Sequence, residues 1–312
     1  MFGPNHYVPH LLTKRGEMTA VKNLSANARA KMTPIFSAHG KDPAGVVVKY
    51  WGVDRCFVTG GSTAEVAGFA AQCQALGVDA IPLLDPALID PSIAALVSSG
   101  LGLRVSPGFN LASALSAASS LGLPQASLDL VVDFQGAPAA LGATYASYLQ
   151  TICGGIPSVG AWRTLTVLGT AFPTPLKGKS GTSFLLDRWC MRGWSSLTGL
   201  VRRPSFGDYT VVNPFGGPLP DPRMLNVAAK IKYATQTAWL IERGHGTKGK
   251  GFGQYKTLAT SIVGSPHWVG VKHCWGCARL HQHTLPTSTS GSHETWVQVA
   301  VSHHLELTAT QV

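Results

Sequence analysis

Short apolar segments alternate with helix-compatible segments over the first two thirds of the chain, and this alternation restricts the possible folds most. Each apolar segment is four to seven residues long and nearly free of charge, which is typical of parallel strands buried on both faces. The predicted strands are Tyr7–Leu12, Thr33–Ser37, Arg55–Thr59, Ala80–Leu84, Leu103–Ser106, Leu128–Phe134, Leu165–Gly169 and Tyr209–Asn213. The predicted helices are Glu17–Lys31, Pro43–Trp51, Ser62–Leu76, Pro86–Ser99, Leu111–Leu121, Pro138–Cys153 and Ser183–Thr198. Eight strands joined by helices predict an α/β fold, a (β/α)8 TIM-like barrel over residues 1–218.

An open, doubly wound sheet is the alternative arrangement of the same elements. Its dinucleotide-binding form carries a G-x-G-x-x-G motif directly after a strand, where the glycines let the backbone approach a pyrophosphate. None of the predicted strands is followed by that motif. The sequence therefore favours the barrel.

The remaining residues, 219–312, are predicted to form a C-terminal α+β appendage packed on the barrel. The segment Gly216–Arg223 is rich in turn-forming residues and is the predicted linker. A hairpin or helices near Ile231–Glu242, a helix near Gly253–Ile262 and a final segment Glu294–Thr308 are expected after it.

The composition excludes several classes of protein. The first residues lack a basic stretch followed by a long apolar run, and no apolar run reaches 18 residues, so neither a secretory signal nor a membrane span is predicted. Six irregularly spaced cysteines fit a reducing compartment better than a disulfide framework. We therefore expect a cytoplasmic protein without a membrane partner.

The positive charge of the chain is concentrated in one segment. The formal net charge is +10, and residues 202–256 contain nine Lys and Arg against three Asp and Glu. Such a concentration favours a local anion site or a nucleic-acid contact, and a solvated basic surface is the alternative.

The most basic part of this segment is a loop with five glycines between Arg243 and Tyr255. Glycines let backbone N–H groups converge on an anion, and Arg243, Lys248 and Lys250 add charge. A helix expected near Gly253 would add its positive dipole end. The spacing is not that of a Walker motif, and a flexible surface loop is the alternative interpretation.

In a TIM-like barrel the chemistry lies at the carboxyl ends of the strands, where Lys14, Glu17 and Asp133 are expected. Asp133 ends an apolar strand, so its carboxylate needs a cation, which Lys14 or Arg15 could supply. A purely structural ion pair is the alternative. The residues predicted to converge at the mouth of the barrel are Lys14, Glu17, Asp133, Asp208, Arg243, Gln254 and His304.

Cys274 and Cys277, followed by His281 and His283, offer four zinc-ligand side chains. The H-x-H spacing departs from that of zinc sites, so buried apolar cysteines are favoured, and neither a metal nor another cofactor is predicted. Further on, His303 and His304 lie in a segment with helical periodicity. At least one of them should pack in the interior, and a ligand-facing role is the alternative.

Several short motifs also occur in the order in which one known protein family carries them. The motifs are YVPHLLTKRGEMTAVKNLS (7–25), TPIFS (33–37), LVVDF (130–134), FGDY (206–209), Trp239…Arg243-Gly244, Gly251…Gln254-Tyr255 and Trp296…His303-His304-Leu305. They resemble the "protein beta" family of phages and bacteria, over nearly the whole chain. Ser37 and Thr59 stand where relatives often carry an acidic residue. The resemblance implies an association with phage–host conflict.

Two hypotheses about function come from different classes. The first is a phage–host-conflict protein that binds a phosphate-bearing or nucleic-acid ligand, or a protein partner, through its basic C-terminal third. Its predicted ligand-binding residues are Lys14, Asp208, Arg243, Lys248, Lys250, Gln254 and His303. The alternative is an enzyme that acts on a nucleotide or another phosphorylated small molecule at the barrel mouth. Its candidate acid–base residues are Glu17, Asp133 and His304.

Overall fold

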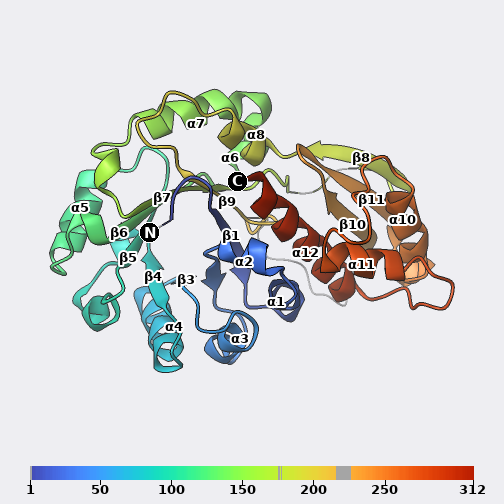
Figure 1. Cartoon of the computed structure of the whole chain (residues 1–312), viewed down its shortest axis with the longest axis horizontal. Helices are drawn as coiled ribbons and strands as arrows, with labels where there is room; N and C mark the ends of the chain where they lie inside the picture. The colour runs from blue at the N-terminus through green and yellow to red at the C-terminus, as the bar shows by residue number, and fades with distance from the viewer. Residues whose placement is uncertain (1, 175, 177, 216–225) are drawn as a thin grey trace.

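The computed structural model describes residues 2–174, 176, 178–215 and 226–312 and confirms the barrel (Figure 1). Eight strands form a closed barrel in which every pair is parallel, and β1 closes it by pairing with β9. The barrel strands are β1 (Tyr7–Leu12), β2 (Ile35–Ser37), β3 (Cys56–Thr59), β4 (Ala80–Leu84), β5 (Leu101–Val105), β6 (Leu128–Asp133), β7 (Thr164–Gly169) and β9 (Ser205–Asp208).

The last barrel strand differs from its prediction. β9 is Ser205–Asp208, and the predicted strand Tyr209–Asn213 lies after it, where Thr210 turns the chain with a φ of 55°. Gly207 lets β9 fit between its neighbours, because a Cβ there would lie 2.8 Å from the Val8 carbonyl oxygen. A four-residue strand in which Phe206 is the one apolar residue carries no apolar run, which explains the error.

Several predicted helices are interrupted in the structure. The helices of the barrel region are α1 (Arg15–Lys22), α2 (Ala26–Ala30), α3 (Pro43–Tyr50), α4 (Thr63–Ala75), η1 (Pro86–Leu88), η2 (Pro91–Leu96), α5 (Leu111–Ser119), η3 (Gln125–Ser127), α6 (Ala137–Leu141), η4 (Gly142–Thr144), α7 (Tyr145–Gly154), η5 (Val159–Ala161) and α8 (Trp189–Ser195). The predicted helix Glu17–Lys31 is two helices, because the Ser25 side chain caps a new one. Asp85 and Asp90, each followed by proline, start two separate 3₁₀ helices in place of the helix Pro86–Ser99.

The appendage is a three-stranded antiparallel sheet covered by helices. Its strand order is β10-β11-β8, with the bounds β8 (Thr182–Asp187), β10 (Ala228–Ala234) and β11 (Ala238–Gly246). β8 occupies part of the predicted helix Ser183–Thr198, so that prediction was wrong over its first half. β8 also comes from the range assigned to the barrel, and the predicted linker Gly216–Arg223 lies outside the described residues. The boundary at residue 218 stays a prediction.

One long helix packs against both the barrel and the appendage. The helices after β11 are α9 (Thr247–Lys250), α10 (Gln254–Val263), α11 (Trp275–Gln282) and α12 (His293–Gln311). Figure 1 shows α12 between the appendage and the first helices of the barrel, and it contacts α1, α11 and β10. Twelve of its residues are buried, which is typical of a helix covered on all sides. Among the described residues, no helix has the length and apolarity that crossing a membrane requires.

Candidate functional site

The interior of the barrel changes from apolar to polar toward its C-terminal mouth. The apolar interior cluster is Val8, Ile35, Phe57, Ile81, Leu83, Val131, Leu168 and Tyr209. Side chains two positions apart on a strand share a face, so the next interior positions are His10, Ser37, Thr59 and Asp133. Active sites of such barrels lie at this end, so these polar side chains mark the candidate site.

Asp133 is the buried acid of this polar layer, and Arg104 on β5 is its partner. The Arg104 guanidinium lies 2.6 Å from Asp133 Oδ2, and the Tyr209 hydroxyl donates to the same oxygen at 2.7 Å. Burial opposes the charge of Arg104, but Tyr209 and Asp133 raise its pKa. The expected partners Lys14 and Arg15 do not pair with Asp133. Arg15 instead forms an ion pair with Glu294 at 2.5 Å.

His10 on β1 lies beside this cluster and is neutral. Its Nε2 atom lies 2.7 Å from the Ser37 hydroxyl, and its ring packs edge-on against Tyr209 at 4.8 Å between centroids. Burial and the nearby Arg104 lower the pKa of His10 to about 3. Its Nδ1 atom is buried without a hydrogen-bond partner among the described residues, so a bound molecule could provide one.

A cavity of about 750 Å³ opens beside His10 and Tyr209, at the ends of β1 and β9. Two predicted site residues, Lys14 and Glu17, line it. Glu17 is 4% exposed and accepts a hydrogen bond from the Leu12 N–H at 2.7 Å. Burial raises the pKa of Glu17 to about 7, although that hydrogen bond and the Lys14 charge oppose the rise. A carboxyl group with such a pKa can exchange protons near neutral pH.

Arg104 also borders a second hollow of about 720 Å³, over the ends of β2 and β3. Lys41 and the pair Gly60-Gly61 line the same hollow. The Arg104 side chain keeps 25% of its surface exposed, so a ligand at the mouth can reach it. The mouth therefore has cations on two sides of the Asp133 cluster.

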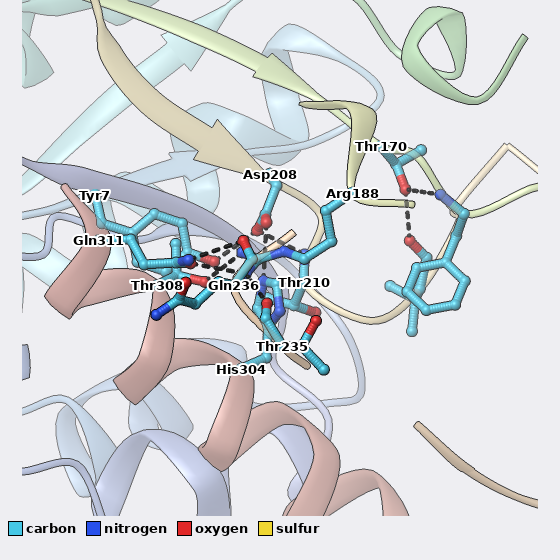
Figure 2. Close-up of polar contacts among 12 residues, drawn as sticks. Tyr7, Thr170, Arg188, Asp208, Thr210, Thr235, Gln236, His304, Thr308 and Gln311 are labelled. Atoms are coloured by element: carbon cyan, nitrogen blue, oxygen red, sulfur yellow. Dashed lines mark hydrogen bonds and ion pairs between the residues drawn. The ribbon is translucent and has the colours of Figure 1, made fainter. Parts of the chain in front are cut away.

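Figure 2 shows a second polar cluster around Asp208, and its members Tyr7, Arg188 and His304 are buried like Asp208 itself. Asp208 accepts hydrogen bonds from Nε2 of His304 at 2.8 Å and from the Tyr7 hydroxyl at 2.5 Å. Burial opposes the charge of Asp208, but His304, Arg188 and Tyr7 keep its pKa below the ordinary value. Burial also lowers the pKa of His304, although the Asp208 carboxylate opposes this shift. His304 is fully buried, and its contacts are those of a residue that fixes α12 to β9.

Comparison with known proteins identifies the family. The family model described as "Beta protein" matches residues 7–309. The chain belongs to the Beta protein family. The match includes both the barrel and the appendage, as the motif order predicted. No curated protein and no solved structure matches the chain.

The residues predicted to converge in this Beta protein family member divide between separate places. Lys14 and Glu17 line the cavity at the mouth, whereas Asp208 and His304 contact each other in the interior. Neither Arg243 nor any other residue of the Gly- and Lys-rich loop forms a hydrogen bond or ion pair with Asp133 among the described residues.

The Gly- and Lys-rich loop is held by its own contacts. Arg243 donates to the Leu176 carbonyl oxygen at 3.0 Å. The Gln254 side chain accepts from the His245 N–H at 2.7 Å and donates to the Gly251 carbonyl oxygen at 2.8 Å. Lys248 and Lys250 lie on the four-residue helix α9, and the backbone N–H of Lys248 donates to Asn226 at 3.2 Å. A ligand-binding role for these residues remains a prediction.

His303 lies in the appendage interior, next to the two cysteines of the C-x2-C motif. Its Nδ1 atom is 3.3 Å from Cys277 Sγ and 3.8 Å from Cys274 Sγ. The neighbouring Cys277 thiol and the His303 ring lower the pKa of the Cys274 thiol. His283, which the sequence suggested as a partner of these cysteines, instead pairs through Nδ1 with the Thr289 carbonyl oxygen at 2.7 Å.

Sequence reasoning missed Arg104, His10 and Arg188. Arg104 and His10 each lie inside an apolar strand, whereas the predicted site residues of the barrel follow the strand ends. Side chains alternate along β5, so Arg104 lies on the same face as Gly102. This face points into the barrel. A charged residue at an interior position of a strand was therefore the available signal.

Proposed function

We propose that this Beta protein family member is an enzyme that acts on a phosphate-bearing small molecule, the size of a nucleotide, at the C-terminal mouth of its barrel. The observation that carries the proposal is the cavity beside the polar layer, with Glu17 buried in its wall and Lys14 at its edge. Its volume of about 750 Å³ is within the range of small-molecule sites.

The residues at the mouth provide distinct roles for such a reaction. Lys14 and Arg104 supply positive charge for the phosphate, and a guanidinium suits phosphate oxygens geometrically. Glu17 has the pKa of a general acid or base that works near neutral pH. His10 is neutral and offers the unpartnered Nδ1 atom to a polar group of the ligand.

The contacts of the basic C-terminal third favour this site over an anion site in that segment. Three cations of this segment donate hydrogen bonds to backbone carbonyl oxygens: Arg202, Arg243 and Lys256. These bonds give the three side chains a structural role. The association with phage–host conflict stays a prediction from the family resemblance.

Binding is tested by isothermal titration with a panel of nucleotides and sugar phosphates, after native mass spectrometry of co-purified small molecules. Lys14→Ala should weaken the affinity of the selected ligand by about 10-fold to 100-fold, since a hydrogen bond to a charged group contributes about 1.5–3 kcal/mol. Lys22→Ala is the matched control, because Lys22 is exposed at the other end of α1 and outside the cavity. Its affinity should equal that of the wild type.

Glu17→Gln separates binding from catalysis. The variant should keep the affinity within a few-fold and lose turnover, because the amide cannot exchange a proton. If Lys14→Ala binds normally while Lys248→Ala/Lys250→Ala abolishes binding, the basic segment is the ligand site and the proposal fails. The proposal also fails if the protein binds oligonucleotides with an affinity that falls steeply with salt, and if Lys248→Ala/Lys250→Ala makes that fall less steep.

A further inference from the structure

Four zinc-ligand side chains lie together where α11 begins against α12. Cys274 is the N-cap residue of α11, Cys277 lies in its first turn, and His303 comes from the middle of α12. His273 precedes the pair, and the donor atoms of His273, Cys274 and His303 all lie within 4.8 Å of one another. The polypeptide therefore brings three of these donors, from α12 and the start of α11, close to one another, and Cys277 places a second sulfur atom beside His303.

The spacing of the donor atoms suits tetrahedral zinc. With Zn–S bonds of about 2.3 Å and Zn–N bonds of about 2.0–2.1 Å, a tetrahedral ion holds a sulfur and a nitrogen about 3.6 Å apart. The distances from His303 Nδ1 to the two sulfur atoms are 3.3 Å and 3.8 Å. Small movements of the side chains would make both distances fit.

The residues around His303 fix the tautomer and the orientation of its ring, as is typical of a metal-ligating histidine. Its Nε2 atom lies 2.8 Å from the Ala234 carbonyl oxygen, which can only accept, so Nε2 carries the proton. Nδ1 then presents a lone pair toward the sulfur atoms, the arrangement that a carbonyl partner typically imposes on a ligating histidine. The Tyr233 ring stacks on His303 with 4.0 Å between centroids and holds its plane.

His273 provides the fourth ligand and an independent indication. Its Nε2 atom is buried and has no hydrogen-bond partner among the described residues. Buried polar atoms without partners are uncommon in folded proteins and call for an explanation, such as a bound ion. A zinc ion shared with His303 would satisfy this atom.

We propose that Cys274, Cys277, His303 and His273 form a structural zinc site that joins α11 to α12 and to the end of β10. Four protein ligands leave no open position, so the ion stabilises the appendage and does not take part in the reaction at the barrel mouth. The expectation of no metal depended on His281 and His283. In the structure, His303, 26 residues after Cys277, and His273 take the places that the sequence had suggested for His281 and His283.

The test is elemental analysis of tag-free protein from zinc-supplemented cultures, after desalting. The wild type should retain one equivalent of zinc, and Cys274→Ser should lose it. Two matched controls should keep the metal: Cys153→Ser, which alters a buried cysteine outside the cluster, and His281→Ala, which removes the alternative ligand. A chelator that extracts the zinc should lower the melting temperature of the wild type and of both control variants, and should leave that of Cys274→Ser unchanged.

Cobalt substitution keeps the proposal testable if Cys274→Ser does not fold. Wild-type protein reconstituted with Co²⁺ should show thiolate-to-cobalt charge-transfer absorption and the intense visible bands of tetrahedral coordination. Folded wild-type protein without zinc and without those bands would overturn the site and leave only thiol–imidazole hydrogen bonds. Neither outcome bears on the Lys14 and Glu17 cavity, because the two sites share no residue.

Discussion

Replacing Asp208 with Asn should destabilise the protein strongly, because Asp208 is a buried carboxylate whose negative charge also offsets the charge of the buried Arg188 (Figure 2). The Arg188 side chain otherwise donates to neutral oxygens of Thr235, Thr308 and Gln311. Leaving a buried charge without the opposite charge that compensates it costs about 3–5 kcal/mol, and Asp208→Asn leaves the Arg188 charge in that state.

The size of the expected effect on the melting temperature follows from the length of the chain. Unfolding entropy is about 2.1 cal/mol/K per residue, which gives about 0.65 kcal/mol/K for a 312-residue chain that unfolds in one transition. A loss of about 3–5 kcal/mol then lowers the melting temperature by about 5–8 °C. Differential scanning calorimetry measures this shift and also reports whether barrel and appendage unfold together.

The matched control is Asp187→Asn, which makes the same substitution in an exposed ion pair. Asp187 lies 2.8 Å from Arg192, and their side chains are 40% and 42% exposed. Exposed pairs contribute about 0–1 kcal/mol, so the melting temperature should fall by less than about 2 °C. Equal shifts in Asp208→Asn and Asp187→Asn would refute the reasoning.

Two further measurements test whether the uncompensated charge of Arg188 causes the loss of stability in Asp208→Asn. Asp208→Asn/Arg188→Met removes both charges and should be more stable than Asp208→Asn alone, because no unpaired charge stays buried. The pKa of Asp208 is lowered in the folded state, so its contribution to stability is present above the unfolded pKa of about 3.9 and is lost as the pH falls through the folded pKa. The stability difference between wild type and Asp208→Asn should therefore shrink on acidification.

Two predictions concern the pH dependence of stability, measured by urea unfolding. Burial raises the pKa of Glu17 from 4.5 to about 7, so the folded state holds a proton that the unfolded state has released. Stability from this group falls as pH rises from 4.5 to 7, and Glu17→Gln should remove that fall. Burial and the Lys230 charge lower the pKa of Lys232 from 10.5 to about 7, so its contribution rises with pH between these values. Lys232→Met should remove that rise, whereas Lys22→Met, at an exposed site, should leave the profile unchanged.

The barrel could be predicted from sequence because parallel strands buried on both faces are almost entirely apolar. The predictions of β8 and β9 were wrong because these two strands do not meet this physical condition. β9 contains Gly207, which allows close strand packing, and Asp208, a buried hydrogen-bonded carboxylate, so it carries no apolar run. β8 is half-exposed with alternating burial and is directly followed by α8, so its residues resembled the start of one helix.

The candidate site could be predicted only in part, for a related reason. Lys14 and Glu17 follow directly after β1, and the position of strand ends in a barrel is enough to find them. Arg104 and His10 depend on which face of a strand points inward, a distinction that requires the exact register. The partner of Cys277 lies 26 residues away on another helix, so only tertiary packing brings His303 to it.

The adjacent residues His303 and His304 have different roles, which the sequence alone could not distinguish. Adjacent residues on an α-helix point about 100° apart, so His303 and His304 face different neighbours. His304 is directed to Asp208 of the barrel, and His303 to the cysteines and the Ala234 carbonyl of the appendage. Because both rings are fully buried and engaged, the pair joins the two parts of the molecule through α12. Acid–base chemistry needs a titrating group that a ligand can reach, and Glu17 lines the cavity at the barrel mouth, whereas Asp133 and His304 are engaged in buried polar clusters.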